Sequence, residues 1–573
     1  MTTHERVHED YEKPETERKF LTDNIPERFF DDADKFSINQ GYLMIRDNKE
    51  IRVRSSEIEN GLTSYTLTIK DGSSDVTRSE LEVEITEQEF SNIWPLTVGK
   101  RIKKDRYKQP IDDDHTLELD IYKSSNIGLV VVEVEFKDEE DANSFIVPNW
   151  LGREVTYSKE FKNKNLARHN GSLNEVTIPE EVDKIEALQG LITYAEVLSR
   201  ISSKPIIMAV AGGSASGKTT IIADKVAEHF GSDARIISLD DYYKGESFMQ
   251  DSLINGIELN WDQPEAVDLE KIGSHLSELV SGSCIEKPIY SFKTGEPEGT
   301  EKVDPLEYRV IIVEGLFALY PEIVEFADIT TFVNTSSHGR MIRRLLRDIE
   351  RSSWELDEIL TYFGKVEEMH QEYVQPTSTK ADVLISNQYS PEEEAVRSGE
   401  YEFQIKYAID PNVVTEKLLR QKGAELIASS ILQKDSYFIF DSKSNKGTTE
   451  IVRIRNSNGE FTFSYKGNQS KDKEYRQRPK IEFSVSNEIL LLVESIYSNP
   501  VKQISKTRSL YLLNGVIVAV DRDVSITENS ESKFLGDFIE LRSSNSGDML
   551  ADVAKKLGIS QKPETRAYFD INK

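Results

Sequence analysis

A glycine-rich stretch in the middle of the chain decides the fold of its central block: Gly212-Gly213-Ser214-Ala215-Ser216-Gly217-Lys218-Thr219. It follows an apolar run, residues 206–210, and precedes a helical pattern that begins at Thr220. Glycines allow the loop to point backbone N–H groups at phosphate oxygens, and the start of the helix adds a favourable dipole. The spacing therefore predicts a phosphate-binding loop, in which Lys218 reaches the terminal phosphates and Thr219 ligates Mg²⁺. The alternative, a glycine-rich turn without a ligand, leaves the strand before it and the helix after it as coincidences.

The block around this loop, from Pro205 to about Asn387, alternates short apolar runs with helical stretches. Apolar runs such as residues 310–313 indicate strands buried on both faces, and hence a parallel α/β sheet covered by helices. Between Pro179 and Lys204 the apolar residues recur at three- and four-residue steps, which predicts a connecting helix. ATP is the expected ligand of the loop, bound by Gly212, Gly213, Ser214, Ala215, Ser216, Gly217, Lys218, Thr219 and Thr220.

The central block resembles the uridine kinase and phosphoribulokinase family over nearly all of its length. The segment Ile237-Ser238-Leu239-Asp240-Asp241-Tyr242-Tyr243-Lys244 matches the family's catalytic segment, so the resemblance implies that Asp240 accepts the proton of an attacking hydroxyl. In the segment 260–266, Asp262 stands in the position that binds the acceptor's hydroxyls. Glu314 ends an apolar strand, where its carboxylate can hold Mg²⁺ or a water of that ion.

A run of arginines follows the last of these segments. Arg340, Arg343, Arg344, Arg347 and Arg351 recur at three- and four-residue steps, which places most of them on one helical face. The resemblance implies a lid helix in which Arg340, Arg343 and Arg347 contact the transferring phosphoryl group. The alternative is a solvated basic face paired with acidic neighbours.

The acceptor region departs from the family pattern in two places. The loop Tyr290-Ser291-Phe292-Lys293-Thr294-Gly295 lacks the family's His, and residues 352–354 lack its Gly-Arg-Asp. These positions shape nucleoside recognition in the family. We therefore expect a nucleoside-like hydroxyl acceptor and leave open whether it is uridine.

The first block, from Glu15 to about Ala167, follows a period of two with turn residues between the runs. This pattern is typical of an antiparallel β domain. Charged residues alternate with apolar neighbours, and acidic pairs and basic pairs occupy separate strands, as in Arg52-Val53-Arg54. A sheet with one solvated face would give the same alternation in any single strand. Because several strands share it, we expect a closed barrel whose ionic lumen suits polyphosphate and divalent cations.

These residues resemble the CYTH family of triphosphate tunnel metalloenzymes, whose signature ExExK is matched by Glu15-Thr16-Glu17-Arg18-Lys19. The resemblance spans about Tyr11 to Ala167 and is closest to compact bacterial members that hydrolyse inorganic tripolyphosphate. It implies that Lys104, partnered by Tyr42, activates the attacking water. The implied ligands of Mg²⁺ or Mn²⁺ are Glu15, Glu17, Glu118, Asp120, Glu133 and Glu135. The implied phosphate-binding residues are Lys19, Arg52, Arg54, Lys70 and Arg106.

The last block follows a polar stretch at residues 388–398, returns to a period of two, and also resembles the CYTH family. Its ionic candidates are Glu402, Lys406, Arg453, Arg455, Lys466, Glu482, Lys506, Arg508, Asp521 and Asp523. Gln404 replaces the second Glu of the opening motif, and Arg542 stands where a late acidic residue is expected. Both changes should weaken divalent-metal binding. We expect a degraded tunnel that binds a phosphate ligand or packs on the kinase.

Composition excludes several classes of partner. The 573 residues carry 71 Lys and Arg against 101 Asp and Glu, a net charge of −30, which argues against duplex nucleic acid and anionic membrane. The single cysteine, Cys284, the charged N-terminus and the short apolar runs predict a cytoplasmic protein. The expected order is an antiparallel β tunnel barrel of the α+β class (1–172), a connecting helix (173–203), an α/β P-loop kinase domain with a parallel sheet (204–390) and a second, CYTH-like β barrel (398–573).

Three functions are compatible with this order. The first is a bifunctional enzyme that hydrolyses metal-bound inorganic triphosphate in the N-terminal tunnel and transfers the γ-phosphate of ATP to a hydroxyl acceptor. The second is a kinase whose flanking barrels sense ligands. The third is a non-catalytic scaffold that holds nucleotide and phosphate, since site residues rather than fold decide function. A cyclase-type reaction on ATP is a further option for CYTH barrels.

Overall fold

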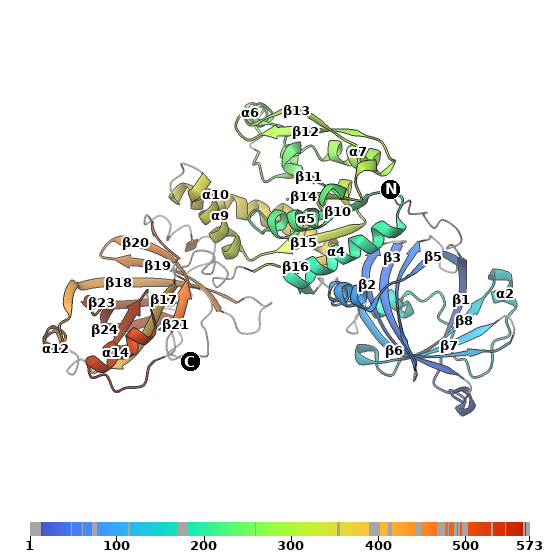
Figure 1. Ribbon diagram of the computed structural model, residues 1–573, viewed down its shortest axis with the longest axis horizontal. Helices are drawn as coiled ribbons and strands as arrows, with labels where there is room; N and C mark the ends of the chain where they lie inside the picture. The colour runs from blue at the N-terminus through green and yellow to red at the C-terminus, as the bar shows by residue number, and fades with distance from the viewer. Residues whose placement is uncertain are drawn as a thin grey trace. The chain divides into compact units, whose positions relative to one another are not determined.

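The computed structural model shows a chain of two compact units, residues 1–335 with 369–387, and residues 336–368 with 388–573 (Figure 1). The structure describes residues 13–31, 33–46, 49–59, 61–71, 77–112, 115–168, 180–257, 259–351, 356–388, 401–410, 415–441, 449–466, 476–479, 481–485, 490, 493–494, 502–528, 531–544, 546–564 and 568. None of the helices in these ranges is long and apolar enough to cross a membrane.

The N-terminal block is a closed antiparallel barrel. Around the ring the strands, blue in Figure 1, follow the order β1-β5-β4-β3-β2-β6-β7-β8, and β1 pairs with both β5 and β8. The strands are β1 (Lys13–Leu21), β2 (Asp34–Arg46), β3 (Lys49–Ile58), β4 (Thr63–Asp71), β5 (Thr77–Glu84), β6 (Arg101–Pro110), β7 (Thr116–Tyr122) and β8 (Val130–Phe136). Three short helices accompany them: α1 (Glu87–Ile93), α2 (Glu139–Ser144) and α3 (Asn163–Leu166).

Side-chain alternation along the strands separates an ionic interior from an apolar exterior. In β3, Arg52 and Arg54 line the interior, whereas Ile51 and Val53 are buried in the core outside the barrel. The register is strongly specified, because a slip of one residue would move every charged side chain to the apolar side. The ionic lumen expected from the period of two is therefore present.

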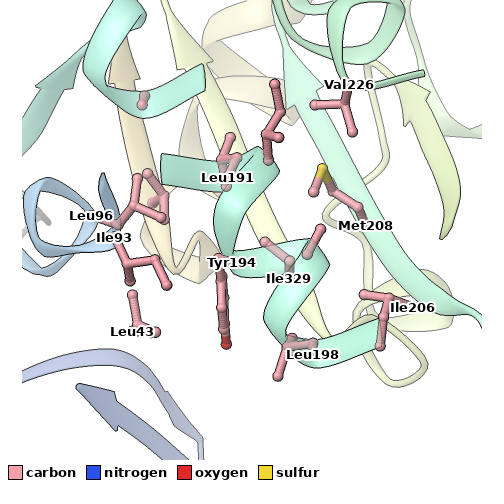
Figure 2. Close-up of a cluster of buried hydrophobic side chains, with 14 of the residues drawn as sticks. Leu43, Ile93, Leu96, Leu191, Tyr194, Leu198, Ile206, Met208, Val226 and Ile329 are labelled. Carbon is pink, nitrogen blue, oxygen red and sulfur yellow. The ribbon is translucent and has the colours of Figure 1, made fainter. Parts of the chain in front are cut away.

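The barrel and the sheet that follows it share one hydrophobic core, built around α4 (Lys184–Ile201). In Figure 2, Leu43 and Ile93 from the barrel block lie on one side of Leu191 and Tyr194 of α4, and side chains of the sheet such as Met208 lie on the other. The short strand β9 (Glu181–Asp183), just before the helix, pairs with the edge of the sheet. The segment expected to be a connecting helix is thus part of the core, because apolar residues cover more than one of its faces.

The central sheet is parallel throughout, in the order β11-β14-β10-β15-β16-β9. Its further strands are β10 (Ile206–Gly212), β11 (Ala234–Ser238), β14 (Val310–Gly315), β15 (Ile329–Asn334) and β16 (Val383–Ser386). Helices α5 (Asp224–Phe230), α6 (Glu246–Ile254), α7 (Leu269–Val280) and α8 (Pro321–Val324) accompany it, with a hairpin of β12 (Ile285–Ser291) and β13 (Glu296–Val303). Every residue of β10 and β14 is buried, as the fully apolar runs predict.

The second unit combines helices with a large antiparallel sheet. Its helices are α9 (Ser337–Arg351), α10 (Leu356–Met369, whose last residue falls in the first unit), α12 (Glu416–Gln421) and α14 (Asp548–Lys556). Its strands are β17 (Tyr401–Ile409), β18 (Glu425–Asp441), β19 (Thr449–Ser457), β20 (Glu460–Lys466), β21 (Arg476–Pro479), β22 (Ile481–Val485), β23 (Lys502–Leu513), β24 (Val516–Glu528) and β25 (Glu531–Ser543).

The order of this sheet repeats that of the N-terminal barrel. It runs β21-β17-β25-β24-β23-β18-β19-β20-β22, so that its two ends, β21 and β22, are separated by one residue in the sequence. In the N-terminal barrel the single strand β5 pairs with both β1 and β4. The pair β21 and β22 borders the corresponding strands β17 and β20.

Candidate functional site

The phosphate loop joins the end of β10 to a helical turn, η5 (Lys218–Ala223), and then to α5. Gly217 has a φ of +88°, in the left-handed region that favours glycine, and a Cβ at this position would lie 2.6 Å from Nδ2 of Asn387. Asn387 Nδ2 and Thr335 Oγ1 both donate to the carbonyl oxygen of Ser216, at 2.6 and 3.1 Å. A glycine and two buried polar side chains therefore fix the shape of the loop.

The residues predicted to hold Mg²⁺ meet at the ends of two neighbouring strands. Thr219 Oγ1 donates to Oε2 of Glu314 at 2.9 Å, and Ser238 Oγ donates to Oε1 of the same carboxylate at 2.6 Å. Lys218 precedes Thr219 at the start of the helical turn. Hydroxyl and carboxylate oxygens are the ligands that Mg²⁺ prefers, so the donor chemistry of this cluster fits the ion.

Asp240, the predicted proton acceptor, follows β11 at the same edge of the sheet. Its backbone N–H donates to Ser238 Oγ at 3.3 Å. Desolvation raises the pKa of the Asp240 carboxyl, Lys218 opposes part of the rise, and the buried carboxylate of Asp262 adds to it. A carboxyl with a raised pKa next to a phosphate loop is suited to accept a proton near neutral pH.

Three aromatic rings form a cluster centred on Tyr243, in the segment that follows Asp240. The ring centroid of Tyr243 lies 5.5 Å from Trp261 and 5.6 Å from Tyr290. Asp241 accepts from the backbone N–H of Tyr290 at 3.3 Å and pairs with the buried Lys287 at 2.5 Å, which ties β12 to the site. Sequence reasoning missed this ring cluster, because its members come from three distant segments. The signal was their place beside the predicted Asp240, Asp262 and acceptor loop.

The predicted lid arginines lie on α9, and they differ in their surroundings. Arg340 is 1% exposed and donates to Glu367 of α10 at 2.5 Å, so its guanidinium is engaged within the second unit, and its contact with a phosphoryl group stays a prediction. Arg343 Nη2 donates to the backbone oxygen of Gln388 at 3.4 Å. Arg347 is more exposed and contacts Asp348 at 2.7 Å.

The N-terminal barrel encloses a cavity of about 260 Å³. Its wall carries the predicted phosphate-binding residues Lys19, Arg52, Arg54, Lys70 and Arg106. It also carries four of the predicted metal ligands, Glu17, Glu118, Glu133 and Glu135, while the side chain of Glu15 lies outside the described residues. Alternation along the strands brings these residues together, as the sequence predicts.

Ion pairs hold one side of this wall. Lys19 Nζ lies 2.7 Å from Glu133 and 3.0 Å from Glu17, and Arg106 contacts Asp120 at 2.7 Å and Glu133 at 2.8 Å. Burial acts to raise the pKa of Glu133, but Lys19 and Arg106 hold it well below its usual range. Burial acts to lower the pKa of Lys19, yet its two carboxylate partners raise it. These side chains are therefore ionised and positioned before any ligand arrives.

On the other side of the wall, Arg54 has a neutral partner. Arg54 Nε donates to the neutral amide oxygen of Gln40 at 3.1 Å. Burial and the neighbouring Arg52 lower the pKa of Arg54 to about 10. Arg52 and Lys70 share the carboxylate of Glu80, at 3.4 and 2.8 Å. A cation held by a neutral amide keeps its charge available for an anionic ligand.

Lys104 and Tyr42, the predicted water-activating pair, occupy different depths. Tyr42 lines the cavity, and its hydroxyl accepts from Gln40 Nε2 at 2.9 Å. Lys104 is fully buried beneath the wall, where its ammonium donates to Asp120. Burial and the neighbouring Arg106 lower the pKa of Lys104 to about 8. The lysine is thus close to losing its proton at physiological pH.

Two acidic side chains of the barrel lumen already have a cationic partner. Among the residues that the structure describes, no three or more His, Cys, Asp or Glu side chains are grouped to hold a metal ion. Glu17, Glu133 and Glu135 have the oxygen chemistry that Mg²⁺ or Mn²⁺ prefers, but the Lys19 ammonium contacts both Glu17 and Glu133. The arrangement is a lumen of paired ions, and metal binding stays a prediction.

Several cavity residues were missed from the sequence. They are Glu50, Lys108, Thr156, Lys162, Asn163 and Lys164. Glu80 and Glu82, whose two-residue spacing with Glu84 places them on one charged face of a strand, also line the cavity. Lys162, Asn163 and Lys164 come from α3 and the residue before it, a segment with no period of two that only the tertiary fold brings to the cavity.

The interior of the C-terminal sheet holds a second ionic network. Arg455 makes two contacts with the fully buried Asp435, at 2.6 and 2.7 Å. Arg508 bonds Asp521 at 2.5 and 2.6 Å. The hydroxyl of Tyr568, near the end of the chain, donates to Asp521 at 2.6 Å. The side chains of Glu402 and Lys466 lie outside the described residues.

Tyr568 fills space inside this network. Its ring lies 4.0 Å from Nζ of Lys406 and 4.8 Å from Nζ of Lys506. Burial and the neighbouring Arg508 lower the pKa of Lys506 to about 8. The interior cations of this domain therefore have internal partners, either carboxylates or an aromatic ring.

A parallel sheet, a glycine loop at the end of β10, and a Thr–Glu–Ser cluster with a carboxyl beside it define a P-loop enzyme of the kinase class. The model of the phosphoribulokinase / uridine kinase family matches residues 207–392. The uridine kinase of Clostridium novyi (strain NT) is 38% identical over 188 residues, which is 32% of this chain and 87% of that protein. The uridine kinase of Brevibacillus brevis is 38% identical over 185 residues, 32% of this chain and 84% of that protein. The chain belongs to the phosphoribulokinase and uridine kinase family.

The CYTH domain model matches residues 399–568. The sequence analysis placed the main CYTH domain at the N-terminus and described this C-terminal block as a degraded copy, so the match corrects the position of the CYTH domain. The chain is a kinase fused to a CYTH domain. The function proposed for the N-terminal barrel rests on the geometry of that barrel.

Two solved structures show partial similarity. The crystal structure of an inorganic triphosphatase is 36% identical in sequence to this chain over the aligned residues. The alignment covers 27% of this chain and 95% of that chain, with a TM-score of 0.22. A possible uridine kinase from Bacillus stearothermophilus is 18% identical, with 34% of this chain and 98% of that chain covered and a TM-score of 0.25.

Proposed function

We propose that this chain is a bifunctional phosphate enzyme. Its N-terminal barrel hydrolyses inorganic triphosphate, and its kinase domain transfers the γ-phosphate of ATP to a hydroxyl of a nucleoside-like acceptor. The observation that carries the first activity is the enclosed cavity whose wall combines five cations with four carboxylates from the predicted set. Such a wall suits a small polyanion that arrives with a divalent cation.

The size and lining of the cavity favour a chain of phosphates over a whole nucleotide. Its volume, about 260 Å³, is below the roughly 300–1,000 Å³ of pockets for drug-sized ligands. Tyr42 is the one aromatic residue among the described residues of its wall, and the others are charged or hydrogen-bonding. A nucleobase would find little apolar surface on which to stack.

The cations of the barrel have different proposed roles, which depend on the residues that they contact. Arg54, held by the neutral Gln40, and Arg52 and Lys70, which share one carboxylate, supply the positive charge that binds the phosphates. Arg106 is oriented by its pair with Asp120, so its contribution to the developing charge needs no rearrangement. This division predicts that loss of Arg54 removes binding without disturbing the ion pairs beneath it.

Lys104 is assigned to the attacking water. Its pKa of about 8 allows a neutral amine to take the proton, provided that Lys104 exchanges its bond to Asp120 for one to water. Tyr42, at the cavity wall, would orient the same water. A divalent ion would draw charge from the phosphate oxygens. Its proposed ligands are Glu15, Glu17, Glu118, Asp120, Glu133 and Glu135, of which Glu17 and Glu133 would release Lys19.

A phosphate-release screen tests the barrel. Tripolyphosphate, pyrophosphate and ATP are compared with Mg²⁺ and with Mn²⁺, using the wild type, Glu17→Gln, and the exposed control Glu59→Gln. We expect release from tripolyphosphate that needs metal, and a raised metal requirement in Glu17→Gln alone. No release from tripolyphosphate, or an unchanged metal titration in Glu17→Gln, would contradict the proposal.

The kinase reaction is supported by the approach of Thr219, Glu314 and Asp240 at one edge of the sheet. Transfer requires Asp240 to take the proton of the acceptor hydroxyl while that oxygen attacks the γ-phosphorus and ADP leaves. The rings of Tyr243, Trp261 and Tyr290 provide a surface for a planar acceptor such as a nucleoside base.

Two substitutions separate the activities. We expect Asp240→Asn to block transfer from ATP to nucleosides while ATP still binds, with the exposed Asp251→Asn as a control. We expect Lys218→Ala to abolish transfer and leave triphosphate hydrolysis intact. Loss of both activities in a folded Lys218→Ala protein would show that the two sites are not independent.

A further inference from the structure

The helices α9 and α10, here called the lid pair, share a hydrophobic core with the CYTH domain. Met341, Ile342 and Leu345 of α9 and Ile359 and Phe363 of α10 lie in one buried cluster with Phe438, Val452, Ile454 and Phe463 of β18, β19 and β20. The buried pair of Arg340 with Glu367 joins α9 to α10 within the same body. A shared core of this kind moves as one unit, because its side chains interlock at close packing.

The surface that the lid pair uses on the CYTH domain has a counterpart in the N-terminal barrel. Val452 and Ile454 lie on the outer side of β19 and alternate along the strand with Arg453 and Arg455, which lie in the interior. In the N-terminal barrel, Ile51 and Val53 occupy the same side of β3 and pack into the core built around α4. In both barrels the outer side of this strand is therefore buried in a hydrophobic core: in the N-terminal barrel it is the core that α1 shares with α4, and in the CYTH domain it is the core of the lid pair.

The phosphate loop is bonded to the places where the chain leaves the first unit. The chain crosses between the units at 335/336 and again at 387/388. Thr335 Oγ1 lies 3.1 Å from the carbonyl oxygen of Ser216 and 2.9 Å from that of Asn387, and Asn387 Nδ2 donates to Ser216 at 2.6 Å. On the other side of the crossings, Ser336 N donates to Gln388 Oε1 at 2.9 Å. Both crossings are thus tied together, and both hold one carbonyl of the phosphate loop.

We propose that the CYTH domain is the regulatory arm of the kinase lid. When ATP binds the phosphate loop, the resulting shift of the loop reaches the lid pair through the contacts of Ser216 with Thr335 and Asn387. The CYTH domain moves with the lid pair because the two share one hydrophobic core. The coupling is reciprocal: the free energy by which ATP binding biases the CYTH domain equals the free energy by which that state of the CYTH domain changes ATP binding. The proposal rests on the proposed function in one respect: it takes the phosphate loop to be the ATP site of the kinase.

Hydrogen–deuterium exchange of the full chain, with and without MgATP, tests the coupling. We expect ATP to slow exchange in the phosphate loop, in α9 and α10, and in β19 and β20 together. A response confined to the phosphate loop, or to the loop and the lid pair, would overturn the proposal. If the coupled response occurs in a protein that transfers phosphate to no nucleoside, the kinase proposal fails and the coupling stands.

A matched pair of threonine substitutions locates the connection. Thr335→Val removes the hydroxyl that holds Ser216, whereas Thr331→Val removes a hydroxyl on the same strand that contacts Ala209 at 3.3 Å, away from the loop. Since one hydrogen bond contributes about 1 kcal/mol, ATP affinity should change by no more than about fivefold in either variant. We expect Thr335→Val to halve the response of β19 and β20, and Thr331→Val to preserve it. Equal responses in the two variants would overturn the assignment.

A second pair tests the shared core itself. Phe463→Ala opens the core between the lid pair and the CYTH domain, and Val518→Ala opens a different core of the same domain. With Phe463→Ala, ATP should still slow exchange in α9 and α10 but no longer in β19 and β20. If ATP slows exchange in β19 and β20 of Phe463→Ala as much as in the wild type, the shared movement is contradicted. If Val518→Ala also abolishes the slowing in β19 and β20, the change in Phe463→Ala reflects general destabilisation of the domain.

Discussion

The two barrels of this chain pair the same residues across the same strands, and yet they differ in how their interior charges are used. Arg106 faces Asp120 between β6 and β7, as Arg508 faces Asp521 between β23 and β24. Burial and the adjacent arginine lower the pKa of Lys104 and of Lys506 to about 8. The shared ladder is therefore a property of the barrel and does not by itself define a site.

The differences lie in two pairs of facing residues, at which three side chains are exchanged. Gln40 faces Arg54 in the N-terminal barrel, and Asp435 faces Arg455 in the CYTH domain. Glu17 and Glu135 face each other between β1 and β8, where the CYTH domain has Gln404 and Arg542. Because Asp435 replaces a neutral amide, Arg455 is neutralised from within, whereas Arg54 is available to a ligand.

This contrast teaches that two barrel interiors can keep the same cations and still pair them differently. The CYTH domain still has buried Arg453, Arg455, Lys506 and Arg508, but its own carboxylates and Tyr568 occupy the places around them. In the proposed triphosphate site, Arg54 is held by the neutral amide of Gln40 instead of a carboxylate. The sequence analysis recognised the departures in the C-terminal block, and the structure shows how they are compensated.

The sharpest test of the contrast compares one arginine from each barrel. Arg54→Ala should lower triphosphate hydrolysis by about 100-fold or more, since a charge-assisted contact to the transition state is lost, with little change in the free energy of unfolding. Arg455→Ala should leave hydrolysis unchanged but destabilise the CYTH domain by about 3–5 kcal/mol, because the buried carboxylate of Asp435 loses the guanidinium that makes two contacts with it. Initial rates and chemical denaturation measure both. A loss of hydrolysis in Arg455→Ala would break the comparison.

Replacing Gln40 with the acidic residue that the CYTH domain has at the equivalent position should weaken triphosphate binding in the N-terminal barrel. In Gln40→Asp, the new carboxylate pairs with Arg54 as Asp435 pairs with Arg455, and triphosphate affinity should fall by about tenfold. The control Gln40→Asn shortens the side chain without adding charge and should cost less. Isothermal titration with tripolyphosphate distinguishes the two, and equal losses would mean that shape rather than charge decides.

The pH dependence of hydrolysis sharpens the roles of the two lysines. A general base must be neutral, so the rate should rise with pH and level off above about pH 8, falling about tenfold for each unit below the pKa of Lys104. Lys104→Gln should flatten this profile, and Lys506→Gln should leave it unchanged. A profile that keeps its shape in Lys104→Gln would assign the proton transfer to another group.

The smallest expected effect concerns Tyr568. Tyr568→Phe removes a hydroxyl that donates to Asp521 while the ring remains, and Asp521 keeps Arg508 and Lys506 as partners. The free energy of unfolding of the CYTH domain should decrease by about 1 kcal/mol, and hydrolysis should not change. Calorimetry of the full chain measures the first quantity. A gain in triphosphate binding would show that the hydroxyl, and not the ring, excludes the ligand.

Much of the architecture was predictable because its signals are local. The glycine loop, the apolar strands of the central sheet and the period of two in both flanking blocks each occupy a few consecutive residues. The placement of Arg52 and Arg54 inside the first barrel followed from their alternation with Val53. Less predictable was the segment around α4, whose apolar residues suggested a linker helix but form a core with elements on both sides.

The sequence by itself determined the phosphate loop, the type of each sheet and the set of charged side chains that share an interior, since spacing alone sets which residues face the same way. Only the tertiary structure decided which cation meets which carboxylate. It buried Arg340 against Glu367, lowered the pKa of Lys104, brought Tyr568 to Asp521 and joined the lid pair to the CYTH domain. These outcomes depend on distances between segments far apart in the chain, and on the water that packing removes, neither of which a local pattern contains.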